Sequence, residues 1–182
     1  HGQEQAKRLA NFVRHLGLGA LYSSDLPRAK ETTEIIAGKL SIEPIYDSRL
    51  RERNVGQWQG LTLGEIREWC ADEYEQFRER LNNFQIPGGE ARFQVVDRLT
   101  SIFDDIERHQ KDVETVAIVT HSIAIRTLLS KLIPDYASGG MPLSNISVTT
   151  IAHEDGEWKM IEANDVSHLD GMEAKTIAEP EA

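Results

Sequence analysis

Residues 113–132 read VETVAIVTHSIAIRTLLSKL, and this stretch decides the fold class. Its first part, Val113–Thr120, is an apolar run of strand length that is rich in β-branched residues and does not alternate with polar ones. Such a run is typical of a parallel strand buried on both faces. Its second part, Ile123–Leu132, has the period of a helix. We therefore predict that Val113–Thr120 is the central strand of a parallel α/β sheet.

The flanking sequence continues the alternation of helix and strand in both directions. The predicted helices are Gln3–Leu18, Arg28–Leu40 with Pro27 in its first turn, Leu63–Trp69, Asp72–Leu81 and a long helix after Gly89 with the buried stripe Phe93, Val96, Leu99, Phe103 and Ile106. The further predicted strands are Ala20–Tyr22, Glu43–Tyr46 and a hairpin of Ser147–His153 with Trp158–Glu162. This order predicts a three-layer α/β/α fold with a mainly parallel sheet and right-handed crossovers.

Length and composition indicate one folded domain. The chain has 182 residues, of which 40% are hydrophobic and 27% charged, and we assign residues 1–169 to a single α/β domain with a small helical cap at about 60–90. Residues 170–182 are acidic and lack periodicity, which predicts a flexible tail. Cys70 is the sole cysteine, which excludes a disulfide framework and favours a reducing, cytoplasmic compartment.

The charge balance limits the classes of partner. A formal net charge of −10 argues against binding of nucleic acid or anionic lipid. No apolar run approaches the roughly 18 residues that a membrane span requires. An anionic ligand would therefore need a local basic pocket, and the oligomeric state is left open.

Three residues could build such a pocket. His121 follows the predicted central strand and precedes a helix, whose free N–H groups can hold an anion. Arg28 follows another strand in the same way, and its planar guanidinium suits phosphate oxygens. Glu52 lies among Arg49, Arg51 and Arg53, where it could donate a proton.

Each of these residues also has a structural interpretation: a helix-capping histidine, an exposed arginine at a helix start, and a solvated charged loop. Taken together they favour phosphoryl transfer, although no nucleophile accompanies them. Neither a G-x-x-x-x-G-K-[ST] nor a G-x-G-x-x-G motif is present, so nucleotide binding of those kinds has no support.

Five segments together resemble the histidine phosphatase superfamily, also called the phosphoglycerate mutase-like family. In the family's order they are SSDLPRAKET from Ser23, RLRERNVGQWQGLT from Arg49, PGGE from Pro87, VTHSIAIRTLL from Val119 and NDVSHL from Asn164. The resemblance covers nearly the whole chain.

What the resemblance implies about the site is specific. Arg28 becomes a phosphate clamp, His121 the second active-site histidine, and Glu52 the proton donor to the leaving oxygen. Arg53 and the N–H of Ser122 are expected to contact substrate. The substrate class is a small phosphorylated metabolite, and no metal or other cofactor is required.

The family's nucleophile is the histidine of an Arg-His-Gly signature that ends the first strand. His1-Gly2 does not match this signature, because QEQAKRLANFV follows it and resembles the family's first helix. We therefore do not assign the nucleophile to His1. The resemblance implies a further central strand, which ends in Arg-His-Gly and precedes residue 1.

The resemblance leaves three functions open. A phosphatase is favoured, because the segment from Glu52 to His121 is compact and acidic whereas mutases look longer and more basic there, and because NDVSHL looks like the small bacterial phosphatases. A cofactor-dependent phosphoglycerate mutase is the alternative. The third is a non-catalytic member that binds phosphorylated ligands or a protein partner. His168, Trp58 and Trp69 could line the site but are better explained as structural residues.

Overall fold

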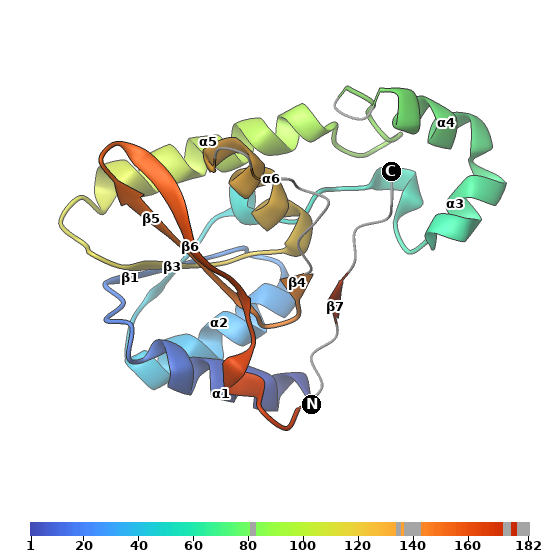
Figure 1. The fold of residues 1–182 in the computed structure, drawn as a ribbon. Helices are drawn as coiled ribbons and strands as arrows, with labels where there is room; N and C mark the ends of the chain where they lie inside the picture. Colours follow the sequence, from blue (N-terminus) through green and yellow to red (C-terminus); the bar gives the residue numbers. More distant parts are fainter. Residues whose placement is uncertain (81–82, 134–135, 137–142, 173–175, 178–182) are drawn as a thin grey trace.

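The structure is a computed structural model that describes residues 1–80, 83–133, 136, 143–172 and 176–177. The elements are, in chain order, α1 (Gly2–Val13), β1 (Ala20–Ser23), α2 (Pro27–Leu40), β2 (Pro44–Tyr46), η1 (Ser48–Leu50), η2 (Gly56–Trp58), α3 (Leu63–Trp69), α4 (Ala71–Glu79), α5 (Arg92–His109), β3 (Val116–Val119), α6 (Ser122–Leu132), β4 (Leu143–Ser144), β5 (Val148–Glu154), β6 (Glu157–Asp165), η3 (Ser167–Leu169) and β7 (Thr176–Ile177) (Figure 1).

A three-stranded parallel sheet forms the middle layer. Its strand order is β2-β1-β3, and Tyr22 of β1 is in register with Ile45 of β2 and Ile118 of β3. Strands β5 and β6 form a separate antiparallel hairpin, and β4 pairs with β7. The predicted strands and the hairpin are therefore confirmed.

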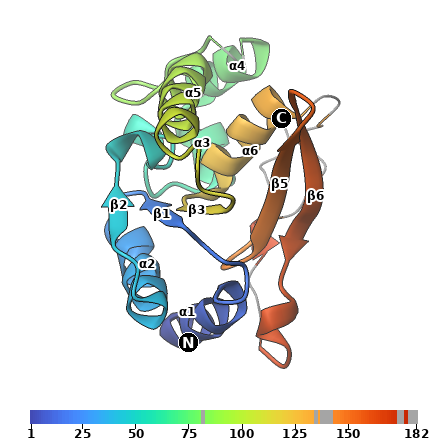
Figure 2. The ribbon, with the colours of Figure 1, turned by 90° about the vertical axis from the view of Figure 1, so that its left-hand side faces the viewer.

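Helices cover both faces of this sheet (Figure 2). Ala20 and Tyr22 of β1 pack with α5 and α6, while Leu21 points to the other face and packs with α1 and α2. The residues of the first cluster include Val95, Leu99, Ile102, Ile106 and Ala124, and those of the second include Leu9, Ala10, Val13 and Ile36. Because side chains alternate along a strand, two apolar layers form, and the predicted α/β/α class is confirmed.

Among the three described parallel strands, the middle one is not the predicted one. It is β1, which is buried throughout, whereas Val116–Val119 of β3 are half-buried. Within the described residues β3 pairs with β1 along one edge and with no strand along the other. Apolarity marks β3 as a strand between helical layers, but it does not encode the strand order.

The predicted stripe of α5 is also partly wrong. Phe93 is 50% exposed and Val96 is half-buried, whereas Val95 is only 1% exposed. Leu99, Phe103 and Ile106 are buried as predicted. Val95 and Val96 both fit the helical period, and only the packing against the sheet decides between them.

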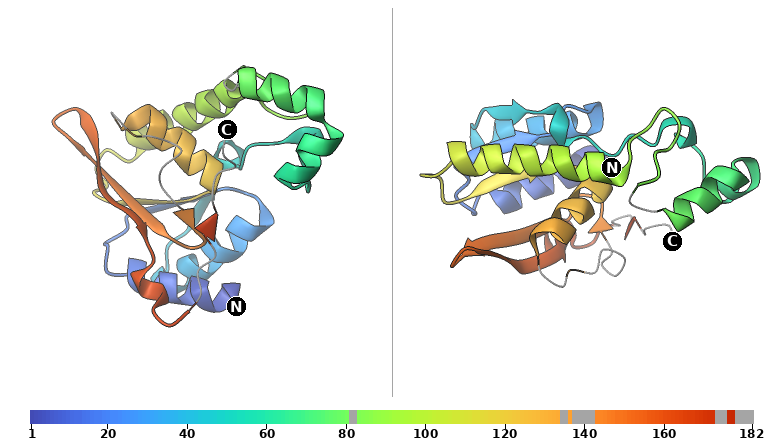
Figure 3. Two further views of the ribbon diagram at one scale, coloured as in Figure 1. Left: turned by 45° about the vertical axis from the view of Figure 1, so that its right-hand side comes forward. Right: turned by 90° about the horizontal axis from the view of Figure 1, so that it is seen from above.

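The cap lies at the side of the sheet to which the carboxyl ends of β1 and β3 point (Figures 1 and 3). It consists of α3 and α4, and a capping box of Thr62 and Glu65 starts α3. Trp58 packs in the cap's own core and is 7% exposed, whereas Trp69 is 61% exposed.

The predicted tail lies largely outside the described residues. Within it, Thr176–Ile177 pair with Leu143–Ser144 in a short antiparallel ladder. No helix in the described part of the chain combines the length and the apolar character needed to cross a bilayer.

Candidate active site

The ends of two neighbouring strands bring His121 and Ser24 together. Ser23 and Val119 are in register, and the Ser24 N–H donates to the Val119 carbonyl oxygen at 2.9 Å. His121 lies two residues after Val119, and its Nε2 lies 2.8 Å from the Ser24 hydroxyl oxygen. Both residues are buried. His121 thus lies at the carboxyl edge of the sheet, as predicted.

Burial and positive charge keep the His121 imidazole neutral. Burial, followed by the positive charges of Arg28 and Arg98, lowers the pKa of His121 to about 4. The resulting group is an uncharged imidazole beside two guanidinium groups. An anion bound there would neutralise the repulsion that opposes protonation.

Arg28 is available for such an anion. It is the second residue of α2, and it is exposed. Its guanidinium makes no hydrogen bond or ion pair with the described residues. The guanidinium of Arg28 therefore has no partner among the described residues, and it lies close enough to His121 to lower the pKa of that histidine.

Glu52 lies over the first turn of α6. Its carboxylate accepts hydrogen bonds from the N–H groups of Ile123 and Ala124, both at 3.2 Å, and from the N–H of Arg53 at 2.9 Å. The Ser122 hydroxyl donates to the same carboxylate at 3.4 Å. The helix start that follows His121 therefore fixes the carboxylate of Glu52.

The side chain of Arg53 contacts the cap and the segment that follows it. It is 6% exposed, its Nε donates to the Glu90 carbonyl at 2.9 Å, and its guanidinium carbon lies 5.9 Å from the centroid of the Phe77 ring. Burial, and then the charge of Arg92, lowers its pKa. The predicted substrate contact of Arg53 stays a prediction.

The other arginines of the 49–53 cluster are paired with carboxylates. Arg49 bonds to Asp47 and Asp105 at 2.8 and 2.7 Å, and Arg51 bonds to Asp25 at 2.6 Å. In these ion pairs both guanidinium groups are engaged away from the Glu52 carboxylate.

Two residues at the site were not predicted. The hydroxyl of Ser24 has no local sequence signal beyond its place in SSDLPRAKET. Arg98 lies on α5 and reaches Glu52 only through contacts that are long-range in sequence, so no local pattern could identify it. Among the described residues no group of three or more His, Cys, Asp and Glu side chains could hold a metal ion.

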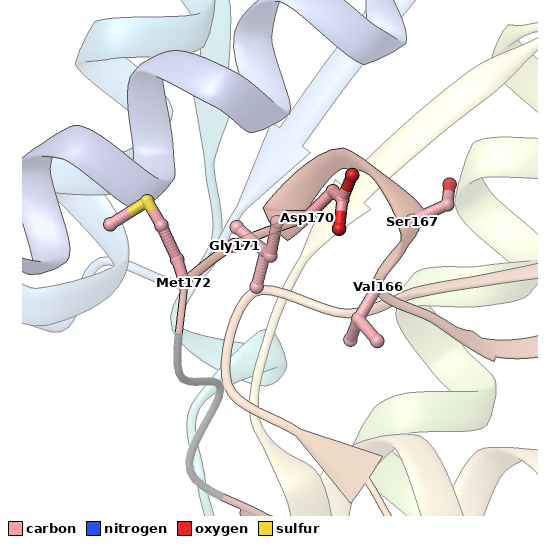
Figure 4. A pocket seen from close by; sticks show the side chains of 6 residues that line it. Val166, Ser167, Asp170, Gly171 and Met172 are labelled. Atoms are coloured by element: carbon pink, nitrogen blue, oxygen red, sulfur yellow. The ribbon is translucent and has the colours of Figure 1, made fainter.

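His168 belongs to a different part of the molecule. It lies in η3, and its ring packs 5.3 Å from the ring of Phe12 on α1. A pocket nearby is lined by Val166, Ser167, Leu169 and residues 170–172 (Figure 4). None of these lining residues is a predicted site residue.

Comparison with known proteins assigns the chain to a family. A sequence model of the histidine phosphatase superfamily, branch 1, matches residues 1–166. The chain belongs to the histidine phosphatase superfamily. This assignment confirms the resemblance seen in the five segments.

Members of the superfamily match most of this chain. Phosphoglycerate mutase-like protein 4 of Arabidopsis thaliana is 35% identical over 173 residues, which covers 93% of this chain and 74% of that protein. The probable phosphoglycerate mutase GpmB of Escherichia coli is 32% identical over 180 residues, covering 93% and 81%. A mycobacterial glucosyl-3-phosphoglycerate phosphatase with inorganic phosphate superposes with a TM-score of 0.79 at 23% identity, covering 91% of this chain and 86% of that one. This last similarity shows a shared histidine phosphatase fold.

Proposed function

We propose that this protein is a phosphatase that hydrolyses a small phosphorylated metabolite through a phosphohistidine intermediate, with Glu52 as the proton donor. The observation that carries the proposal is that Glu52 and His121 both lie at the start of α6. The exposed Arg28 is close enough to His121 to lower its pKa. A free guanidinium and a neutral imidazole suit a phosphoryl group, and the Glu52 carboxyl group held at the helix start suits proton transfer.

Two steps complete the reaction. In the first, the nucleophilic nitrogen forms a bond to phosphorus, the P–O bond to the alcohol breaks, and Glu52 gives its proton to the leaving oxygen. In the second, Glu52 takes a proton from water, the water oxygen attacks phosphorus, and the P–N bond breaks. Arg28 and His121 stabilise the charge on the transferring group in both steps.

The nucleophile in this proposal is the histidine of the family's Arg-His-Gly strand. Among the described strands none pairs with the second edge of β3, and this edge together with the half-burial of Val116–Val119 supports a further strand beside β3. A histidine at the carboxyl end of such a strand would lie at the same edge as His121. We also propose, from the lone Cys70 and the family resemblance, a cytoplasmic enzyme that needs no metal.

The cap favours a phosphatase over a mutase. Acidic residues outnumber basic ones in residues 60–90, which disfavours a second phosphate on the substrate. The mutase alternative is supported by the names of the Arabidopsis and Escherichia coli relatives. A mutase primed with a bisphosphorylated sugar acid would interconvert 2- and 3-phosphoglycerate faster than it releases phosphate.

The test replaces Glu52 by Gln in the full natural protein and measures alcohol release in a single turnover. With an alkyl phosphate, the Glu52→Gln rate should fall by about 10³-fold, because an alkoxide leaves poorly without a proton. With para-nitrophenyl phosphate the loss should be less than about tenfold, because nitrophenolate needs no proton. Glu65→Gln is the matched control, since Glu65 also accepts from an N–H and a hydroxyl but lies in the cap.

Each outcome discriminates. Equal losses on both esters contradict the role of Glu52 as proton donor, and a primed interconversion that outpaces hydrolysis identifies a mutase. A phosphoryl label that is stable in base and lost in acid supports phosphohistidine. If the natural protein binds phosphate esters but does not hydrolyse them, the proposed function is rejected. The remaining alternative is then a non-catalytic member that binds phosphorylated ligands.

A further inference from the structure

Arg98 on α5 binds the loop that carries Glu52 through three main-chain carbonyls. Its Nη1 donates to the carbonyl oxygens of Arg49 and Arg51, both at 2.7 Å, and its Nη2 donates to that of Glu52 at 3.2 Å. The side chain is 17% exposed, so water competes little for these bonds. A planar guanidinium is the one side chain that can serve several acceptors in this way.

Glu90 completes this set of contacts from the other side of the loop. Its carboxylate accepts from Arg98 Nε at 2.8 Å and Nη2 at 3.0 Å, and also from the Asn54 N–H at 2.8 Å. Its own N–H donates to the Asn54 carbonyl at 2.8 Å, and its carbonyl accepts from Arg53. Every residue from Arg51 to Asn54 is thus bonded to Arg98 or Glu90.

Two glycines bring the segments of Glu52 and Glu90 into main-chain contact. A Cβ on Gly56 would collide with the Pro87 carbonyl, and a Cβ on Gly89 would lie 2.6 Å from the Asn54 carbonyl oxygen. Gly56 also has a φ of +50°, which disfavours other residues. The segments of Glu52 and Glu90 therefore pack main chain against main chain at these two glycines.

We propose that Arg98 and Glu90 act as a positioning pair that holds the Glu52 carboxylate at the start of α6. Neither side chain bonds to that carboxylate; they fix the backbone on both sides of it. The charge of Arg98 also reaches His121, so one residue of α5 acts on both halves of the site. The kinetic part of this inference rests on the proposed function, whereas its structural part does not.

The main test is Arg98→Gln in the full natural protein. Loss of the backbone contacts should let Glu52 leave α6, so NMR amide exchange of Ile123 and Ala124 should become roughly tenfold faster. In the phosphatase assay, kcat should fall roughly 10- to 100-fold while KM stays within about threefold, because misplacement of a proton donor affects the chemical step. Arg98→Lys should recover little, because a lysine lacks the fork.

Arg49→Gln is the matched control. Arg49 precedes Glu52 in the same loop and also ion-pairs with α5, at Asp105, but it does not bond to residues 51–54. We expect normal exchange at Ile123 and Ala124 and near-normal kcat in this variant.

Unchanged exchange at these two amides in folded Arg98→Gln overturns the inference, whatever the enzyme's activity. If Arg98→Gln does not fold, Glu90→Gln decides by the same readout, with an expected acceleration of roughly threefold. Faster exchange in a protein that hydrolyses no phosphate ester upholds the positioning pair and rejects the proposed function, so the two failures can be told apart.

Discussion

His121 is buried and His168 is half-buried, and the two histidines lie in very different surroundings. Burial lowers the pKa of both. His121 ends a parallel strand, bonds to Ser24, and has Arg28 and Arg98 as its charged neighbours. Neither ring nitrogen of His168 has a hydrogen-bond partner of normal geometry in the described chain, although the Asp165 carboxylate and the Ile146 backbone favour its protonated form.

The difference shows that burial and a low pKa do not by themselves mark a functional histidine. The sign of the neighbouring charges and the place on the sheet distinguish the two residues. Arginines prepare the surroundings of His121 for an anion, whereas the carboxylate beside His168 would repel one.

The largest expected contrast is in activity. His121→Asn should lower kcat/KM for a phosphate ester by about 10³-fold, because the proposed mechanism uses this imidazole to stabilise the transferring phosphoryl group. His168→Asn should change it by less than about threefold. Steady-state assays of both full-length variants measure kcat/KM. Equal losses would show that the charges around a histidine do not distinguish a functional histidine from a structural one in this protein.

The second contrast is in stability against pH. The folded pKa of His121, about 4, lies below the ordinary value of 6.5, so the unfolded chain binds more protons between these pH values. The free energy of unfolding should therefore fall as pH drops from about 6.5 to 4, and this residue should contribute about 2 kcal/mol of the loss. Below pH 4 its contribution is constant.

Urea unfolding of wild type and His121→Gln at pH 7 and pH 4.5 measures this contribution. The difference between the two proteins cancels the titration of the carboxylates that they share. A loss with pH that is equal in both proteins would contradict a neutral buried His121.

The smallest contrast concerns the serines next to the two histidines. Ser24→Ala removes the hydroxyl that bonds to His121 Nε2, and we expect roughly a tenfold loss of kcat, which corresponds to about 1.4 kcal/mol. Ser167→Ala, beside His168, should leave kcat unchanged. A reversed order of the two effects in parallel assays would exclude an orienting role for Ser24.

Much of the fold was predictable, because each element carries a local signal. Val113–Thr120 indicated a strand by its apolar run, and α2 indicated its start by Pro27. The order of strands depends on pairings between distant segments, so the sequence could not show that β1 lies between β2 and β3 in the described sheet.

The site shows the same division. Parallel strands present their carboxyl ends at one edge of the sheet, and this rule alone predicts from the sequence that Arg28 and His121 lie at the same edge. It could not identify Arg98, whose bonds to residues 49–52 span more than 45 positions of the chain. Nor could it identify Ser24, because the role of this hydroxyl depends on its hydrogen bond to His121, which only the structure shows.

The contact of Gly56 with residues 87–89 has a consequence for how this enzyme family can diversify. The cap is closed at its base by main chain against main chain, which depends on two glycines and not on the identity of the cap's side chains. Substitutions between Leu61 and Ile86 can therefore change the side chains of the cap while the bonds around Glu52 persist. Under the proposed function, the chemistry and the choice of substrate are then encoded in separable stretches of sequence, so selection can change one and keep the other.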